Sequence, residues 1–120
     1  QGISTFYAEL LRIKQMVQYS QKRRPMLVLI DEIFKGTNSA DRLVGAQAVI
    51  TQLAKPWCIT LVSTHDFELC DLDKDPAVQA VNYHFSEYYV DDEIHFDYLM
   101  RSGRCQTTNA KQLMHMAGLL

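Results

Sequence analysis

Hydrophobic residues recur at helical spacing in two segments of the chain. Between residues 4 and 20 they are spaced by four, three and four, which lines them along one helical face. A second stripe lies between residues 43 and 53. The stripes are Phe6, Leu10, Ile13 and Val17, and Leu43, Ala46, Ile50 and Leu53. Ser4 or Thr5 is suited to cap the first helix, because a side-chain hydroxyl accepts a hydrogen bond from a free backbone N–H.

Two continuous apolar runs, "MLVLI" at 26–30 and "CITLVST" at 58–64, flank the second helical stripe. Runs without polar alternation are typical of parallel strands that are covered by helices on both faces. The order helix, strand, helix, strand predicts a βαβ unit. The fold class is therefore α/β, with parallel central strands and flanking helices.

The pattern changes beyond residue 72, where aromatic residues partly alternate with polar ones. Segments 81–90 and 93–100 are separated by two aspartates and predict an antiparallel hairpin. Few Lys or Arg residues interleave with its aromatic side chains, so we expect these to pack rather than to stack on nucleic-acid bases. A short helix is predicted at the end, with Thr107 or Thr108 near its start and Gly118 near its end.

Length and composition limit the classes of function. The 120 residues, 48% of them hydrophobic and 22% charged, suit one globular domain. A net charge of −2 gives no basic surface field, so any DNA contact would come from elsewhere. The cysteines at 58, 70 and 105 fit neither a disulfide framework nor a zinc site, and no segment is apolar enough to cross a bilayer. We expect a cytoplasmic protein, and the opening "QGISTF" suggests a fragment.

Charged side chains follow both apolar runs, where the strands are predicted to end. Asp31 and Glu32 come directly after the first run, and His65 follows the second. Ligands of open α/β sheets bind beyond the carboxyl ends of parallel strands, so we expect these three residues to surround one site. In many nucleotide hydrolases one strand-end carboxylate holds hydrated Mg²⁺ and a second orients the attacking water. A cation would also offset the repulsion between adjacent carboxylates.

Purely structural explanations exist for the same residues. Asp31 could cap the following turn, Glu32 could be solvated, and His65 could hydrogen-bond to a loop. Short motifs often occur by chance, so a hydrophobic run followed by Asp-Glu is weak by itself. The histidine at the end of the next strand favours the nucleotide site.

Two further segments have both a structural and a functional interpretation. "GTNSAD" at 36–41 is a turn into a helix that Asn38, Ser39 or Asp41 can cap, and the same loop could contact a second subunit. Ser4 either caps a helix or helps to bind a phosphate at its positive end. The sequence contains no G-x-x-x-x-G-K-[ST] phosphate-binding loop, so it holds half of a nucleotide site.

Four segments, taken together, resemble the ATPase domain of the MutS family of DNA mismatch repair proteins. They are "STF", "LVLIDEIFKGTNSADR", "STHDFEL" and "TTNAKQLMHMAGL", in this order. The resemblance covers nearly the whole chain, and the joint order is more specific than any single segment. It implies that residues 1–120 are the C-terminal part of one ABC-type P-loop ATPase domain, with the phosphate-binding half upstream.

The resemblance also implies roles for individual residues. Asp31 corresponds to the Walker B magnesium ligand, Glu32 to the catalytic carboxylate and His65 to the histidine that senses the γ-phosphate. Ser4 corresponds to the signature serine that reaches the nucleotide of the opposite subunit in a head-to-tail homodimer, and residues 38–41 to a loop at that interface. The implied nucleotide-binding residues are Ser4, Asp31, Asn38, Ser39 and Asp41. Mg²⁺ and ATP are the implied cofactors, and DNA would bind through domains outside this chain.

The sequence departs from the family at the acidic pair. Mismatch-repair members usually read "DEIGRGT", whereas Phe34 and Lys35 stand in place of Gly-Arg here, and the branch with "DELGAGTDP" does not match either. The chain therefore resembles a divergent MutS-related protein. The alternatives are another ABC-type ATPase, which would carry a Gly-rich signature before the first helix, and a non-catalytic dimerisation module. Without a phosphate-binding loop, these 120 residues alone are expected not to hydrolyse ATP.

Overall fold

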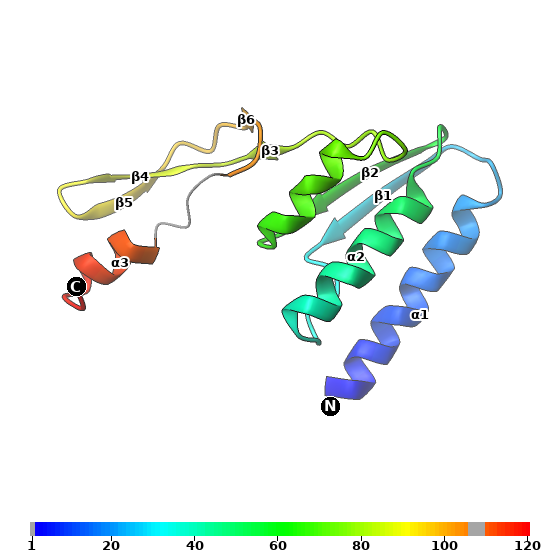
Figure 1. Ribbon diagram of the computed structural model, residues 1–120, viewed down its shortest axis with the longest axis horizontal. Coiled ribbons are helices and arrows are strands. Elements are labelled where there is room, and N and C mark those ends of the chain that lie inside the picture. Colours follow the sequence, from blue (N-terminus) through cyan, green and yellow to red (C-terminus); the bar gives the residue numbers. More distant parts are fainter. Residues whose placement is uncertain (1, 106–109) are drawn as a thin grey trace. The chain divides into compact units, whose positions relative to one another are not determined.

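The computed structural model describes residues 2–105 and 110–120 and contains small parallel and antiparallel sheets in a mixed α/β arrangement (Figure 1). The chain divides into two compact units, Gln1–Ala80 and Val81–Leu120, which are described separately. No helix of the described residues has the length and hydrophobicity needed to cross a membrane.

The first unit contains the predicted βαβ arrangement. Its elements are α1 (Gly2–Ser20), β1 (Met26–Asp31), α2 (Ser39–Leu53), β2 (Cys58–Ser63) and a 3₁₀ helix, η1 (Phe67–Lys74). Strands β1 and β2 pair in parallel along their full length, from Met26 opposite Cys58 to Asp31 opposite Ser63. The parallel pair and the crossover helix are therefore confirmed. Ser4 and Thr5 lie within α1, so the prediction that one of them precedes and caps this helix is wrong.

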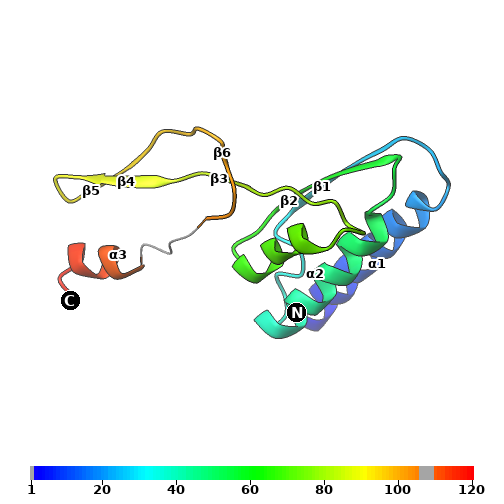
Figure 2. The same ribbon diagram turned by 45° about the horizontal axis from the view of Figure 1, so that its top comes forward.

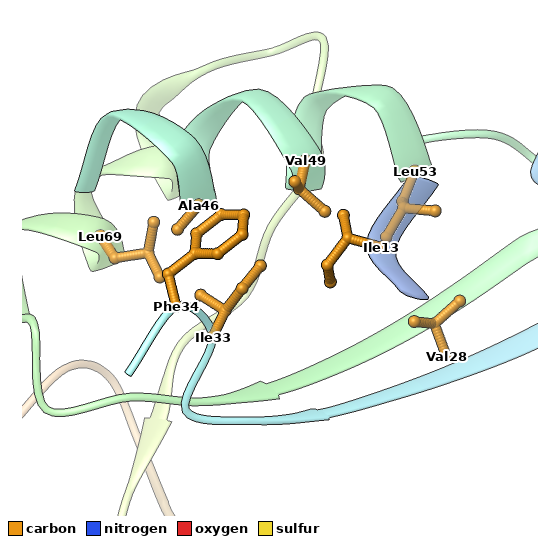
Figure 3. Packing of buried hydrophobic residues seen from close by; sticks show 8 residues of the cluster. All are labelled: Ile13, Val28, Ile33, Phe34, Ala46, Val49, Leu53 and Leu69. Carbon is orange, nitrogen blue, oxygen red and sulfur yellow. The ribbon is translucent and has the colours of Figure 1, made fainter. Parts of the chain in front are cut away.

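The core lies between the β1–β2 sheet and the helices. Figure 3 shows side chains of α1, β1, α2, η1 and the loop after β1 converging there. The buried hydrophobic residues are Ile13, Val28, Ile33, Phe34, Ala46, Val49, Leu53 and Leu69. Partly buried side chains of the same strands, such as Ile30 and Val62, extend this cluster.

Helices cover one face of the β1–β2 sheet. Figures 1 and 2 show α1 and α2 side by side on the same face. On the opposite face, Leu27, Leu29, Ile59 and Leu61 are 59–67% exposed. For the described residues, the prediction of helices on both faces is therefore wrong. The apolar run identified the strands correctly, but one half of its side chains has no cover within this chain.

Trp57 fixes the C-terminal end of α1 to the sheet. Its indole Nε1–H donates to the Ser20 carbonyl at 2.6 Å, and its own carbonyl accepts from the Met26 N–H at 2.9 Å. The Arg23 guanidinium lies over the indole, 5.2 Å from the ring centroid. The end of α1 and the start of both strands are thereby held together.

The turn after β1 contains two non-glycine residues with left-handed backbone conformations. Glu32 has a φ of 55° and Phe34 a φ of 59°. Bulky residues rarely adopt such values, so neighbouring contacts must stabilise them. The Phe34 side chain is buried, forms an edge-to-face contact with Phe6 at 5.8 Å between ring centroids, and lies against α2 beside Ala46 (Figure 3).

The second unit contains the predicted hairpin. Its elements are β3 (Tyr83–His84), β4 (Glu87–Val90), β5 (Glu93–Phe96), β6 (Arg101–Ser102) and α3 (Ala110–Met116). Strand β4 pairs with β5 and β3 with β6, both antiparallel. Asp91 and Asp92 have φ values of 51° and 61°, as a two-residue turn between twisted strands requires.

The prediction that the hairpin aromatics pack is wrong for all of them except the partly buried Tyr89. Tyr83, Phe85, Tyr88, Phe96 and Tyr98 are 48–80% exposed. Their contacts are local, such as the stacking of Tyr88 on its cross-strand partner His95 at 5.4 Å. Strands β4 and β5 have four residues each and form a two-stranded sheet in the described structure, which offers little surface for these rings to pack against.

The end of the chain agrees with the sequence where it is described. Helix α3 ends at Met116, and Gly118 follows with a φ of 80°, the conformation typical of a glycine beyond a helix C-terminus. Thr107 and Thr108, which were predicted near its start, lie outside the described residues.

Gly45 of α2 leaves the space that the Phe34 ring occupies. A Cβ atom at this position would lie 2.6 Å from Cε2 and 2.9 Å from Cδ2 of that buried ring. We expect Gly45→Ala to destabilise the fold, because overpacking costs about 1–3 kcal/mol and exceeds the helix-propensity gain of about 1 kcal/mol. Thermal unfolding of the variant measures the difference. A combined Gly45→Ala, Phe34→Leu variant should lose less than the two single losses added, and simple additivity would contradict the steric explanation.

Candidate functional site

The carboxyl ends of β1 and β2 bring the two predicted acidic residues and the histidine into one region. The Glu32 N–H donates to the Ser63 carbonyl at 3.0 Å, so the pairing continues one residue beyond β1. Glu32 Oε1 lies 2.9 Å from His65 Nε2. The prediction that these two side chains meet at neighbouring strand ends is confirmed.

Asp31 lies on a different side of the strand end from Glu32. Its Oδ1 accepts a hydrogen bond from Ser63 Oγ at 2.5 Å, and both residues belong to the face of the sheet that carries the exposed leucines. The left-handed φ of Glu32 turns its side chain out of the strand alternation. The two carboxylates are consecutive in sequence but have different neighbours.

A cavity of about 350 Å³ opens beside Glu32 and His65. It is lined by Glu32, Ile33, Lys35, Arg42, Thr64, His65 and Asp66. Lys35 Nζ lies 3.9 Å from the second Glu32 oxygen, so the carboxylate has a basic neighbour on each side. Glu32 and His65 line this cavity and Asp31 does not, so the prediction that all three residues share one pocket is wrong for Asp31.

An ion pair between α2 and the segment after β2 fixes the backbone around His65. Arg42 Nε and Nη2 donate to the two Asp66 carboxylate oxygens at 2.7 and 2.9 Å, a bidentate arrangement. The Asp66 N–H also donates to Thr64 Oγ1 at 2.9 Å. Both neighbours of His65 are thus anchored, although its own side chain is 89% exposed.

The Arg42–Asp66 contact shifts both protonation equilibria. Hydrogen bonds from Arg42 lower the pKa of Asp66 against the opposing effect of burial, and the charges of Arg42 and His65 lower it further. The hydrogen bond to Asp66 raises the pKa of Arg42, again against burial, with smaller contributions from the charges of Asp66 and Glu32. Both groups are therefore charged at neutral pH.

Asn38 caps α2, as the structural interpretation of "GTNSAD" predicts. Its Oδ1 accepts from the Asp41 N–H at 2.9 Å and its Nδ2 donates to Asp41 Oδ2 at 3.0 Å. Asp41 lies in the first turn, where its charge favours the helix dipole. Ser39 is the first residue of the helix. None of these three residues lines the cavity, and their role at a subunit interface stays a prediction.

Ser4 lies in the first turn of α1, and its side chain is outside the described part of the structure. Its predicted role at a second nucleotide therefore stays a prediction. For the residues that are described, no three His, Cys, Asp or Glu side chains gather to form a metal site. A divalent cation bound by the described residues would therefore have fewer than three such side chains as ligands.

Several residues of the site were not identified from the sequence. Arg42 and Asp66 pair across 24 positions, and Glu9 of α1 accepts a hydrogen bond from the Phe34 N–H across 25 positions. Asp66 directly follows His65, which was a weak signal of a site residue. Arg42 and Glu9 occupy helical positions where a charged residue usually faces solvent, and no local pattern marks them.

Comparison with known proteins places the chain in a family. The family described as MutS domain V matches residues 1–119. The chain therefore belongs to the MutS family and carries this domain. The confirmed strand ends, with Glu32 against His65, are part of the matched region.

Two relatives illustrate the similarity. The chain is 31% identical over 120 residues to the DNA mismatch repair protein MutS of Aquifex pyrophilus, and 32% identical over 119 residues to that of Natronomonas pharaonis. Each comparison covers 98% of this chain and 14% of the relative. The chain thus spans about a seventh of the length of these relatives.

We expect the contribution of Asp66 to stability to depend on pH. Its folded-state pKa lies below the ordinary value of 3.8, so the contribution is complete above that value and is lost as pH falls through the lower folded pKa. Asp66→Asn should lower the melting temperature at pH 7, and the difference from the wild type should shrink below about pH 4.

Thermal unfolding between pH 7 and pH 3 measures this difference. The matched control is Asp73→Asn, an exposed aspartate in η1 outside the ion pair. An equal loss at every pH would contradict the assignment, because it would show that the carboxylate charge is not the stabilising feature.

Proposed function

We propose that this chain contributes the water-orienting and γ-phosphate-sensing side chains to an ATP-hydrolysing site of a MutS-family protein that acts on DNA. The observation that carries the proposal is the 2.9 Å contact of Glu32 with His65 at the carboxyl ends of two paired parallel strands. The match to MutS domain V, together with the resemblance of the sequence to a MutS ATPase domain, supports this reaction.

In this proposal Glu32 orients and polarises the water that attacks the γ-phosphate. The Glu32 side chain is 39% exposed, so a water molecule can reach it, and the turn after β1 fixes the direction in which it leaves the backbone. His65 Nε2–H donates to Glu32, and the 89% exposed imidazole is free to turn toward a phosphate oxygen. His65 would then donate either to the Glu32 carboxylate or to a γ-phosphate oxygen. The position of Glu32 would therefore depend on whether the γ-phosphate is present.

Asp31 is the described residue that would hold a magnesium ion accompanying ATP, and it lies at the strand end outside the cavity lining. Asp31 supplies a carboxylate at the strand end, and Ser63 Oγ orients it by donating to one oxygen. Mg²⁺ usually keeps several waters and binds one or two carboxylates plus substrate phosphates, so the lack of a larger acidic cluster among the described residues is compatible with it. When bound, the ion would neutralise charge on the phosphates.

The proposal extends to the wider protein. The parallel β1–β2 pair would belong to a larger ABC-type P-loop sheet whose phosphate-binding loop lies in another part of the protein. Ser4 and the 38–41 loop would complete a composite site with a second copy in a homodimer. The similarity to DNA mismatch repair proteins MutS supports a role in DNA mismatch repair. In this proposal DNA is bound by other domains and the protein is cytoplasmic.

A non-catalytic association module is the second candidate. The observation that favours it is the exposed apolar face of the sheet, where Leu27, Leu29, Ile59 and Leu61 are uncovered. Both candidates use the same fold, and they differ in whether Glu32 is needed for turnover.

We expect Glu32→Gln to reduce ATP turnover by the intact protein by about 100-fold or more. Gln keeps the size of the side chain but cannot polarise water as a carboxylate does. Nucleotide affinity should change by no more than about twofold, because the substitution removes an interaction made in the transition state. Steady-state phosphate release and equilibrium nucleotide binding provide the two measurements.

The matched control is Glu68→Gln, an exposed glutamate of η1 that does not line the cavity. It should retain wild-type turnover. Near-normal turnover with Glu32→Gln would remove Glu32 from the proposed role. Absence of turnover in the intact wild-type protein, with self-association preserved, would favour the association module.

A further inference from the structure

We propose that Glu9 of α1 is a positioning residue for Glu32, through a hydrogen bond to the backbone of the turn that carries Glu32. This inference rests on the proposed function, since it assigns a second residue to the same ATP-hydrolysing site. Glu9 does not line the cavity, so it would act on Glu32 through the backbone of the turn after β1.

The contact joins a helix to the turn after β1. Glu9 Oε2 accepts a hydrogen bond from the Phe34 N–H at 2.7 Å, the short distance typical of a backbone amide bound to a carboxylate. Phe34 is buried, so its amide has little access to water. Without Glu9 this donor would lose its partner in an apolar environment, which disfavours the present conformation of the turn.

The turn needs such a contact because its backbone is strained. Glu32 and Phe34 both have left-handed φ values, and Ile33 between them is buried. A carboxylate that binds one specific N–H selects the orientation of that peptide plane. Because Ile33 is the single residue between Glu32 and Phe34, fixing the Phe34 amide also restricts the direction of the Glu32 side chain.

Glu9 and Phe6 act from the same face of α1. They are three positions apart, so both side chains reach the turn, Phe6 by its ring contact with Phe34 and Glu9 by its hydrogen bond. Trp57 holds the other end of the same helix to the sheet. The helix is thus a rigid support from which Glu9 can keep Glu32 facing His65.

The test compares Glu9→Ala with Glu9→Gln in the intact protein. Gln retains a side-chain carbonyl that can accept from the Phe34 N–H, whereas Ala cannot. In Glu9→Ala we expect amide hydrogen exchange of residues 31–36 to be about tenfold faster and kcat for ATP hydrolysis about tenfold lower, with KM within about twofold. Glu9→Gln should recover most of both effects. Gln15→Ala, an exposed change on the same helix, is the control and should resemble the wild type.

Three results would overturn the inference. Exchange of residues 31–36 that stays at the wild-type rate in Glu9→Ala would exclude the hydrogen bond. Faster exchange with unchanged kcat would exclude the positioning role, and equally faster exchange throughout β1 and β2 would indicate general destabilisation. In each case Glu32→Gln still reports on the proposed function by itself. An intact protein that turns over ATP at a rate insensitive to Glu32→Gln would instead overturn the proposed function, and the positioning role with it.

Discussion

The in-register pairing of β1 with β2 brings Glu32 and His65 of the candidate site together. Because Asp31 pairs with Ser63, the residues that follow each strand leave the sheet at the same edge, and Glu32 meets His65. A shift of one residue would turn the buried Val28 to the exposed face and separate the acidic pair from the histidine. The register is in turn selected by the apolar side chains that pack beneath α1 and α2.

The turn after β1 sets the direction in which the Glu32 side chain leaves the strand end. A regular continuation of the strand would place the side chain of residue 32 toward the core, on the face of Ile30. The left-handed backbone of Glu32 and Phe34 instead buries Ile33 and Phe34 and leaves the Glu32 carboxylate at the cavity. Burial of two large apolar side chains contributes about 3–6 kcal/mol, comparable to the cost of about 2–6 kcal/mol for two left-handed conformations.

Local patterns in the sequence were sufficient for α1, β1, α2, β2, the β4–β5 hairpin and α3, but they did not predict η1 or the pairing of β3 with β6. They also predicted that Glu32 and His65 lie close together, because the carboxyl ends of paired parallel strands lie at the same edge of a sheet. The pairing of Arg42 with Asp66 and of Glu9 with the Phe34 amide depends on the distance between elements that are not adjacent in sequence, and no local pattern contains it. The uncovered face was missed because a continuous apolar run is typical of a strand covered on both faces, and it does not identify the elements that would cover them.

The alternation of side chains between the two faces of β1 explains why two adjacent carboxylates can follow this strand. Asp31 keeps the strand's alternation and lies on the face of Leu27 and Leu29, where Ser63 binds it. Glu32 leaves the alternation and is bound by His65 beside the cavity. Each carboxylate therefore has its own hydrogen-bond donor, and the repulsion between them is reduced without burying either charge. In the proposed function, this separation would direct Asp31 and Glu32 to different tasks, one at a metal ion and the other at the attacking water.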